Sequence, residues 1–194
     1  MEYQLNLRMD PERSPETIVT IQFPDCDPYG HLNNSRYIDY FLNARDNQVF
    51  EYYNFDSREV SEGLHQGWVV EQTKISYNLP AVYREKVVIR TRLIQVTDRN
   101  VVMEAIMMDE KKKRIKALMW IEVVWVDFLT QRPVNHEPQL QRLLDSIKIE
   151  DYEYSPEKFD DRLSEVSKEI KFDLRKKREA SLAVAGLDQL SARS

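Results

Sequence analysis

The residues whose types and spacing could carry out chemistry are concentrated in residues 25–34, which read Asp-Cys-Asp-Pro-Tyr-Gly-His-Leu-Asn-Asn. Two carboxylates, Asp25 and Asp27, precede a histidine, His31, and two amides that can cap a helix. A carboxylate can act as a nucleophile or as a general base toward water. The free N–H groups of a helix N-terminus can stabilise an oxyanion, and losing one such donor typically costs roughly 2.7–4 kcal/mol. The stretch therefore predicts a site for acyl transfer.

Two structured segments flank this stretch and would position it. In residues 17–23, Val19, Ile21 and Phe23 alternate with other residues, which is the pattern of a half-buried strand. Behind the stretch, apolar residues recur at helical spacing from Tyr37 to about residue 53. The residues available to cap the first turn are Asn33, Asn34 and Ser35. The order strand, acidic turn, capped helix brings the carboxylates to the positive end of the helix dipole.

Strand patterns dominate the chain from residue 68 to residue 126. The segments 68–77, 87–96, 101–108 and 115–126 are rich in β-branched and other apolar residues. Short polar connections predict that the last three segments pair as an antiparallel meander. Because segment 115–126 is apolar on both faces, we expect it inside a sheet that is covered on both sides. The helix covers one face, and we expect a partner subunit to cover the apolar patch on the other.

The last part of the chain differs in composition. Residues 138–148 carry leucines and an isoleucine at helical spacing, which predicts a short helix. From residue 149 onward the sequence is heavily charged. We therefore predict a domain at residues 1–148 and a charged, mainly helical extension at residues 149–194. Inside the extension, Ile170, Phe172 and Leu174 alternate as in a strand, so its local structure stays open.

The composition argues against several classes of protein. The single cysteine, Cys26, can form neither an intramolecular disulfide nor a thiolate metal cluster, and with no apolar leader it predicts a cytoplasmic protein. No apolar run approaches transmembrane length, so we expect no membrane partner. A net charge of −5 argues against nonspecific nucleic-acid binding. The four glycines form no phosphate-binding loop, and we expect no nucleotide cofactor.

Residues 23–37 resemble the signature of the hotdog-fold thioesterases, particularly the acyl-CoA and acyl-carrier-protein thioesterases of the hydroxybenzoyl-CoA thioesterase-like branch. The resemblance continues through residues 68–81 and 126–134 and covers about residues 17–145. It implies an α+β hotdog fold, in which an antiparallel sheet wraps around one long central helix. It also implies a homodimer or homotetramer with the active site between subunits.

The resemblance assigns roles to residues of the acidic turn. Asp27 matches the catalytic carboxylate, and backbone amides from His31 to Asn34 match the group that polarises the thioester carbonyl. The implied reaction is hydrolysis of an acyl-CoA or acyl-carrier-protein thioester to the free acid and thiol, without metal or cofactor. The expected substrate contacts are Tyr29, Gly30, Leu32, Asn33, Tyr37 and His65. Tyr29 is bulkier than the residues common in the family, which affects the shape of the acyl pocket.

Structural interpretations stand beside these roles. Asp27 could only form the turn, and Asp25 is better suited to accept backbone hydrogen bonds than to react, because two close carboxylates repel each other. The flanking acids disfavour a thiolate at Cys26, which we expect to pack. His31 could position the thioester or shuttle a proton, or it could be structural. Asp39, one turn into the helix, is the reserve catalytic carboxylate.

Four further residues carry weaker expectations. His65 and His136 are weaker candidates than His31, and we expect His65 at the surface, although a partner's active-site loop could lie beside it. Glu71 is either half-exposed or a buried carboxylate lining the cleft, and Asp46 is a second acid on the helix. A metal site formed by the two acids and the histidine of the turn lacks a further ligand at suitable spacing, so we expect none.

Basic residues could contact a phosphate-bearing substrate despite the acidic total charge. They are Lys111, Lys112, Lys113 and Arg114 at one turn, and Arg84, Lys86, Arg90 and Arg92 along a strand. Two other functions remain open. A hotdog enoyl-thioester hydratase would share the fold, but its motif places the histidine differently after the Asp-Pro pair. A non-catalytic acyl-CoA-binding or regulatory protein would keep the fold without turnover.

Overall fold

A computed structural model describes residues 11–191 of the chain. Within them, neighbouring strands pair antiparallel in the order β1-β3-β4-β5-β2, and β6 pairs with β5. The strands are β1 (Glu16–Thr20), β2 (Gln66–Tyr77), β3 (Lys86–Val96), β4 (Asn100–Asp109), β5 (Ile115–Asp127) and β6 (Arg132–Pro133). The predicted meander of β3, β4 and β5 is confirmed, and β5 lies inside the sheet between β4 and β2.

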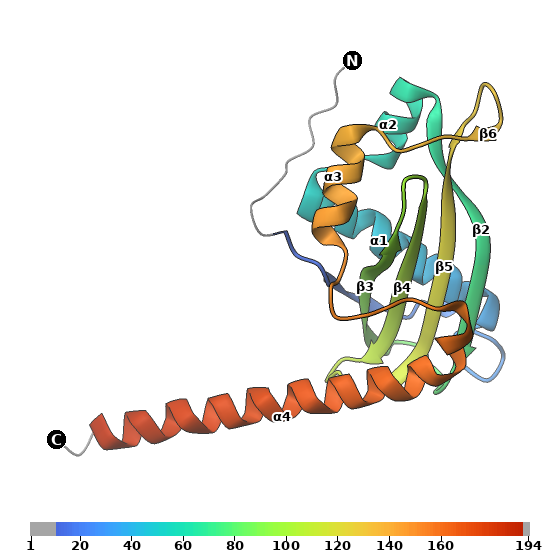
Figure 1. Cartoon of the computed structure of the whole chain (residues 1–194). Helices are drawn as coiled ribbons and strands as arrows, with labels where there is room; N and C mark the ends of the chain where they lie inside the picture. The colour runs from blue at the N-terminus through green and yellow to red at the C-terminus, as the bar shows by residue number, and fades with distance from the viewer. Residues whose placement is uncertain (1–10, 192–194) are drawn as a thin grey trace. The chain divides into compact units, whose positions relative to one another are not determined.

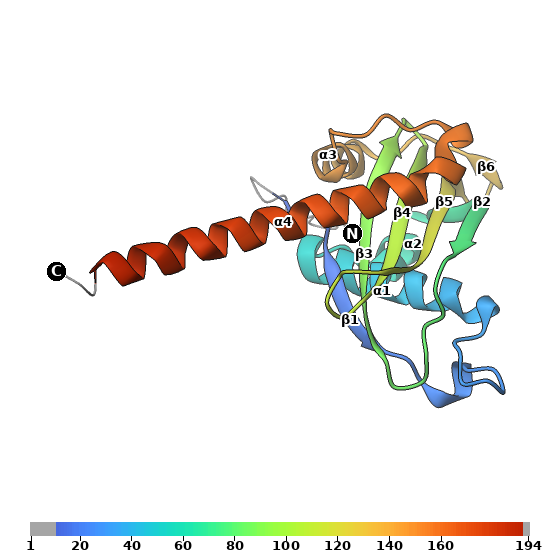
Figure 2. The same cartoon turned by 90° about the horizontal axis from the view of Figure 1, so that it is seen from below.

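One long helix runs across a face of this sheet, as Figures 1 and 2 show. The helices are α1 (Tyr37–Tyr53), α2 (Ser57–Leu64), α3 (Pro138–Ile147) and α4 (Phe159–Ser191), and the short 3₁₀ helices are η1 (Phe23–Asp25), η2 (Asn34–Arg36) and η3 (Pro156–Lys158). The helix α1 ends at Tyr53, as predicted, because Asn54 adopts a left-handed conformation and its N–H bonds the carbonyl of Phe50. The predicted α+β arrangement, a sheet wrapped around one helix, is confirmed.

The core lies between α1 and the sheet face that it covers. The helix buries Tyr37, Phe41 and Ala44, while alternate residues of β3, β4 and β5 point toward them. Burying a side chain of this size contributes about 1.5–3 kcal/mol. Gln48 is also fully buried, but its Nε2 donates to the Thr17 Oγ1 at 3.0 Å and to the Ile89 carbonyl at 3.2 Å. The buried amide nitrogen is therefore satisfied.

The first strand is shorter than predicted. The alternation of residues 17–23 predicted a strand through Phe23, but β1 ends at Thr20, and η1 begins at Phe23. Ile21 is buried as expected, whereas Phe23 is 72% exposed. Pro24 explains the difference, because its ring fixes the backbone and removes the N–H that a strand ladder needs.

Part of the second sheet face is covered by the chain itself, which corrects the expectation that a partner subunit covers it. Trp120 of β5 stands on this face, with ring centroids 5.2 Å from Tyr154, 5.2 Å from Phe159 and 6.2 Å from Tyr152. The N–H of Ile149 also bonds the Leu93 carbonyl at 3.0 Å. No sequence pattern indicated this contact, because the aromatic residues of the segment 152–159 stand among many charged ones and pack on a residue far away in sequence.

The chain divides into two compact units, residues 1–159 and 160–194. The second unit is helical throughout residues 160–191, so Ile170 and Phe172 belong to a helix rather than to a strand. Within it, Arg162 bonds Glu165 at 3.0 Å and Glu169 at 2.8 Å. None of the helices in the described part of the chain combines the length and apolarity that a membrane span requires.

Candidate active site

The acidic turn is held by hydrogen bonds centred on Asp27. Its N–H donates to the His31 carbonyl at 2.7 Å, and its carbonyl accepts from Gly30 at 2.9 Å. Its Oδ1 accepts from the N–H groups of Tyr29 at 2.9 Å and His31 at 3.0 Å. Gly30 has a φ of 78°, a conformation that favours glycine. Asp27 therefore forms the turn, and its Oδ2 accepts no hydrogen bond from any residue that the structure describes.

Asp25 braces the turn against α1. Its Oδ2 accepts from the Tyr40 hydroxyl at 2.8 Å, and Arg36 lies 3.7 Å from its Oδ1. Burial and then the neighbouring carboxylate raise the pKa of Tyr40 to about 12, so this phenol stays protonated and donates. Cys26 donates to the Gln22 carbonyl at 3.3 Å, and burial together with the two flanking carboxylates raises its pKa. Asp25 thus has a structural role, as predicted, but its carboxylate accepts from a side-chain hydroxyl and not from the backbone N–H groups that the prediction named.

Of the backbone amides of residues 31–36, all but one donate to an acceptor. The acceptors are Asp27 Oδ1 for His31, the Ala81 carbonyl for Leu32, the Asp25 carbonyl for Asn33, Asn33 Oδ1 for Ser35 and the Asn33 carbonyl for Arg36. The N–H of Asn34 has no acceptor among residues 11–191. It stands at the first residue of η2, which leads directly into α1, where helix N–H groups and the dipole favour negative charge. This amide is therefore available to bind an oxyanion.

A loop distant in sequence supports the other side of the turn. In this loop, which comprises residues 80–85, the Ala81 carbonyl accepts from the Leu32 N–H at 2.8 Å. The Tyr83 N–H donates to the Gly30 carbonyl at 2.9 Å. The Ala81 N–H also donates to the buried hydroxyl of Tyr37 at 3.0 Å. At the end of β2, the Tyr77 hydroxyl donates to the Asn34 carbonyl at 2.9 Å. The segment that carries the free amide is therefore fixed from two sides.

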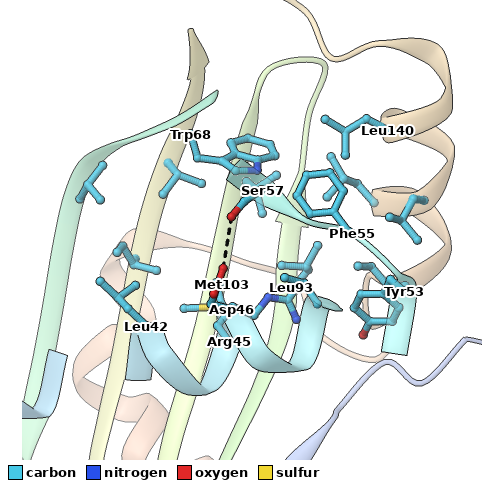
Figure 3. A pocket seen from close by; sticks show the side chains of 18 of the residues that line it. Leu42, Arg45, Asp46, Tyr53, Phe55, Ser57, Trp68, Leu93, Met103 and Leu140 are labelled. Atoms are coloured by element: carbon cyan, nitrogen blue, oxygen red, sulfur yellow. Dashed lines mark hydrogen bonds between the residues drawn. The ribbon is translucent and has the colours of Figure 1, made fainter. Parts of the chain in front are cut away.

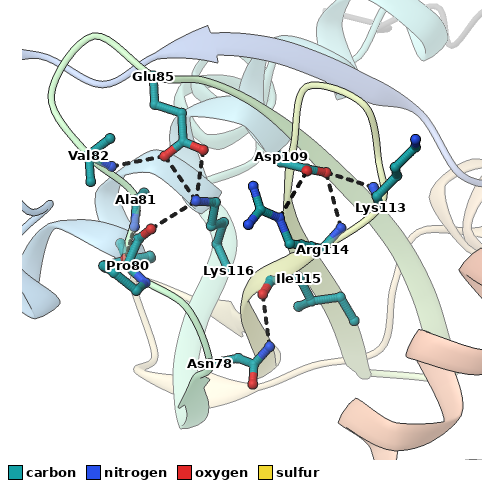
Figure 4. A network of polar contacts seen from close by, with 11 residues as sticks. Asn78, Pro80, Ala81, Val82, Glu85, Asp109, Lys113, Arg114, Ile115 and Lys116 are labelled. Atoms are coloured by element: carbon teal, nitrogen blue, oxygen red, sulfur yellow. Dashed lines mark hydrogen bonds and ion pairs between the residues drawn. The ribbon is translucent and has the colours of Figure 1, made fainter.

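An ion pair in turn holds this loop, as Figure 4 shows. Lys116 on β5 lies 2.7 Å from Glu85 and donates to the Pro80 carbonyl at 2.9 Å. The Val82 N–H donates to the other Glu85 carboxylate oxygen at 3.0 Å. The side chains of Lys116 and Glu85 are only 8% and 20% exposed. Sequence reasoning missed both residues, since neither belongs to a motif and 31 positions separate them.

The remaining predicted substrate contacts fall in different places. Tyr29 is 85% exposed at the tip of the turn, and Asn33 caps η2 through the Ser35 N–H. Leu32 and Tyr37 are buried in the core. His65 follows α2 in a left-handed conformation and precedes β2, at the opposite end of that strand from Tyr77. Within one chain, His65 therefore does not join the site.

Other sequence candidates have structural partners. Asp39 pairs with Arg36 at 3.0 Å, and the Ser57 hydroxyl donates to Asp46 at 3.2 Å. Glu71 is exposed and accepts from Asn100 at 3.1 Å, which settles its two alternatives in favour of exposure.

His136 is buried, with its ring centroid 4.8 Å from that of Trp68, and burial lowers its pKa. The loop before α3 folds onto the sheet and buries this histidine between two tryptophan rings.

The basic strand residues are largely compensated by carboxylates. Arg90 bonds Glu16 at 2.8 Å, and Arg92 bonds the buried Glu104 at 2.6 Å. Lys112 also bonds Glu16. These charges are thus engaged within the protein and are poorly placed to bind phosphate. In the described part of the chain, no group of three or more His, Cys, Asp or Glu residues has a metal-binding arrangement.

Comparison with known proteins places this geometry in a family. The family model of the Thioesterase-like superfamily matches residues 21–144. The long-chain acyl-CoA thioesterase FadM of Escherichia coli K12 is 25% identical over 132 residues, which are 68% of this chain and 98% of that protein.

Solved structures agree with this match. The probable thioesterase YbaW from Escherichia coli superposes with a TM-score of 0.60 at 25% identity, covering 69% of this chain and 98% of that one. A DHNA-CoA thioesterase from Staphylococcus aureus has a TM-score of 0.63 at 16% identity, covering 69% and 90%, and shows the shared fold. The chain therefore belongs to the thioesterase-like superfamily and has the hotdog fold.

Proposed function

We propose that this protein hydrolyses acyl-CoA thioesters, with Asp27 as the catalytic carboxylate and the Asn34 N–H as the donor to the thioester carbonyl oxygen. The proposal rests on two groups of the same turn, a carboxylate oxygen and a backbone N–H, that have no hydrogen-bond partner in the described part of the chain. Asp27 is fixed through Oδ1 while Oδ2 has no partner among the described residues, and Asn34 alone of residues 31–36 has an amide without an acceptor there.

Two routes are compatible with this arrangement. Asp27 can attack the thioester carbon, which expels the CoA thiolate and forms an anhydride that water then cleaves. Alternatively, Asp27 can remove a proton from a water that attacks the same carbon, after which the tetrahedral intermediate expels the thiolate. In both routes negative charge develops on the carbonyl oxygen, where the Asn34 N–H and the helix dipole stabilise it.

A second copy of the chain would complete the site. The strand β2 is 12 residues long and lies at the edge of the sheet, with Val69 and Val70 exposed. An edge strand of this length leaves backbone N–H and C=O groups unpaired along its outer side and is a template for pairing with another strand. Antiparallel pairing of two copies along β2 would bring the His65 end of one strand toward the Tyr77 and Asn34 end of the other. His65 could then contact substrate bound to the partner, as the sequence predicted.

Thiol release from purified protein tests the proposal, measured with a thiol-trapping reagent and a panel of acyl-CoA substrates. We expect Asp27→Asn to lower kcat at least about a hundredfold, the lower end for positioned acid–base groups, without loss of the folded state. Asp39→Asn is the matched control and should keep near-normal turnover, because Asp39 only pairs with Arg36 at the helix surface. Full activity in Asp27→Asn would contradict the assignment. Tight acyl-CoA binding without any thiol release would instead indicate a binding protein.

A further inference from the structure

Two exposed aromatic rings and an arginine form a cluster on the surface beside the acidic turn. Phe23 of η1 is 72% exposed and Tyr83 of the loop 80–85 is 39% exposed, and their ring centroids lie 5.6 Å apart in an edge-to-face arrangement. The guanidinium carbon of Arg84 lies 5.0 Å from the centre of the Tyr83 ring, which is a cation–π distance. We call these three residues the Phe23–Arg84 cluster.

Backbone hydrogen bonds attach this cluster to the turn from two directions. The Tyr83 N–H donates to the Gly30 carbonyl at 2.9 Å, and the Cys26 N–H donates to the Phe23 carbonyl at 3.1 Å. Asp27 follows Cys26 directly in the chain. The cluster therefore has a fixed position relative to the candidate catalytic carboxylate.

The charge of Arg84 is not compensated by a nearby acid. Arg84 is exposed, and no carboxylate in the described part of the chain lies within 4.0 Å of its guanidinium. Arg90 and Arg92 differ, since each is paired with a glutamate. The backbone of Arg84 is left-handed, with a φ of 63°, a conformation that is uncommon for residues other than glycine. Its planar guanidinium can bind a phosphate through two parallel N–H groups.

The combination of rings and cation suits a purine nucleotide. A base can stack on an exposed aromatic ring whatever its sequence identity, and a phosphate can pair with the guanidinium beside that ring. An alkyl chain would use the rings alone, and inorganic phosphate would use the cation alone. CoA carries an adenine nucleotide with phosphates at the end opposite its thiol, so it offers both groups together.

The distance from Asp27 to the cluster matches the reach of CoA. The Gly30 N–H donates to the Asp27 carbonyl, and the Cα atoms that span such a turn lie within about 7 Å of each other. The hydrogen bond between Tyr83 and Gly30 adds about 5.5 Å, the spacing of paired backbones. Tyr83 therefore lies within about 12 Å of Asp27. The pantetheine arm has about thirteen bonds between sulfur and phosphorus and spans up to about 15 Å, at roughly 1.2 Å per bond.

We propose that the Phe23–Arg84 cluster binds the adenine nucleotide of CoA while the thioester occupies the Asp27–Asn34 site. This inference rests on the proposed function and specifies its substrate as a CoA thioester rather than a carrier-protein thioester. Arg84 binds a phosphate, and the rings of Phe23 and Tyr83 support the base. These residues bind the part of the substrate that does not react, so they are substrate-binding residues and take no part in the chemical step.

Two substrates that share a thioester but differ in the nucleotide test the proposal. We expect Arg84→Gln to lower kcat/KM for hexanoyl-CoA about tenfold, the lower end for a hydrogen bond to a charged group. The same variant should leave hexanoyl-pantetheine, which has no nucleotide, within about twofold. Tyr83→Leu keeps the backbone N–H that holds Gly30 and should lower kcat/KM for hexanoyl-CoA about fivefold, the lower end for stacking a base on a ring.

Arg142→Gln is the matched control, because Arg142 is an exposed arginine of α3 and its substitution removes the same charge. It should leave both substrates unchanged. Equal losses on the two substrates in a folded Arg84→Gln variant would show that Arg84 only positions the turn, and no loss on either would show that it contacts no substrate. A loss on an acyl-carrier-protein thioester alone would assign the cluster to a protein partner. Each of these three results overturns the proposal.

A binding measurement separates this inference from the proposed function. Adenosine diphosphate carries the purine and the diphosphate of CoA but no thioester, so its binding does not depend on hydrolysis. In an NMR titration we expect it to bind the wild type and to bind Arg84→Gln about tenfold more weakly. Equal hydrolysis of hexanoyl-CoA and hexanoyl-pantetheine without nucleotide binding would refute the cluster's role while the function stands. If no thioester is hydrolysed, the proposed function fails, and the titration alone decides whether the cluster binds a nucleotide.

Discussion

The ion pair between Lys116 and Glu85 should control the active site from a distance. Lys116→Met removes the cation but keeps the length of the side chain, so the Pro80 carbonyl loses its donor and the Glu85 carboxylate loses its ion pair and keeps only the Val82 N–H. Orphaning a buried charge of this kind costs about 3–5 kcal/mol. Because Glu85 is 20% exposed, water recovers part of this loss, and we expect a decrease in the free energy of unfolding of about 2–3 kcal/mol.

The Lys116→Met substitution should also lower the rate of catalysis. The loop held by Lys116 bonds the backbone of Gly30 and Leu32, so its loosening would displace the turn that carries Asp27 and Asn34. We expect kcat for acyl-CoA hydrolysis to fall at least tenfold while KM changes less, because the lost positioning matters most in the transition state.

Urea unfolding and steady-state kinetics measure the two effects. Lys86→Met is the control, since Lys86 lies 3.9 Å from Glu110 in an exposed pair, and such pairs contribute at most about 1 kcal/mol. The double variant Lys116→Met/Glu85→Gln removes the orphaned charge and should recover part of the stability. If Lys116→Met unfolds like the wild type and keeps its kcat, the ion pair does not position the site.

Three further predictions concern single side chains. Burial lowers the folded-state pKa of His136, so the unfolded chain binds its proton first, and the free energy of unfolding should fall as pH drops below about 6.5, by up to about 1.4 kcal/mol per pH unit. Urea titrations at several pH values check this, and His136→Asn should flatten the dependence. Tyr77→Phe removes the bond to the Asn34 carbonyl and should cost about 0.5–1.5 kcal/mol of stability and lower kcat severalfold. Gly30→Ala forces a Cβ into a left-handed conformation and should lower stability by about 1–2 kcal/mol in thermal unfolding, whereas no change would show that the turn adapts.

The sequence by itself determined most of the local elements and pointed to the acidic turn as the candidate site. The α1 periodicity and its end near Tyr53 are local signals that the structure confirms, and of the three predicted cap candidates Asn33 caps η2, the short helix that leads into α1. The strand alternation likewise predicted the meander, because a strand's pattern follows from which face is buried. Asp27 and Asn34 were predicted as site residues because both lie within one short motif whose residue types suit acyl transfer.

Tertiary structure alone decided what surrounds and supports the candidate site. Lys116, Glu85 and the loop at Ala81 reach the turn through contacts between residues far apart in sequence, and no periodicity marks such pairs. The cavity lined by residues of α1, the sheet and α3 (Figure 3) arises from three elements that meet only in the fold. Trp120 is buried because the charged segment after α3 brings Tyr154 and Phe159 against its ring. Local patterns report the burial of each element, whereas the partner that buries it is set by the packing of the whole chain.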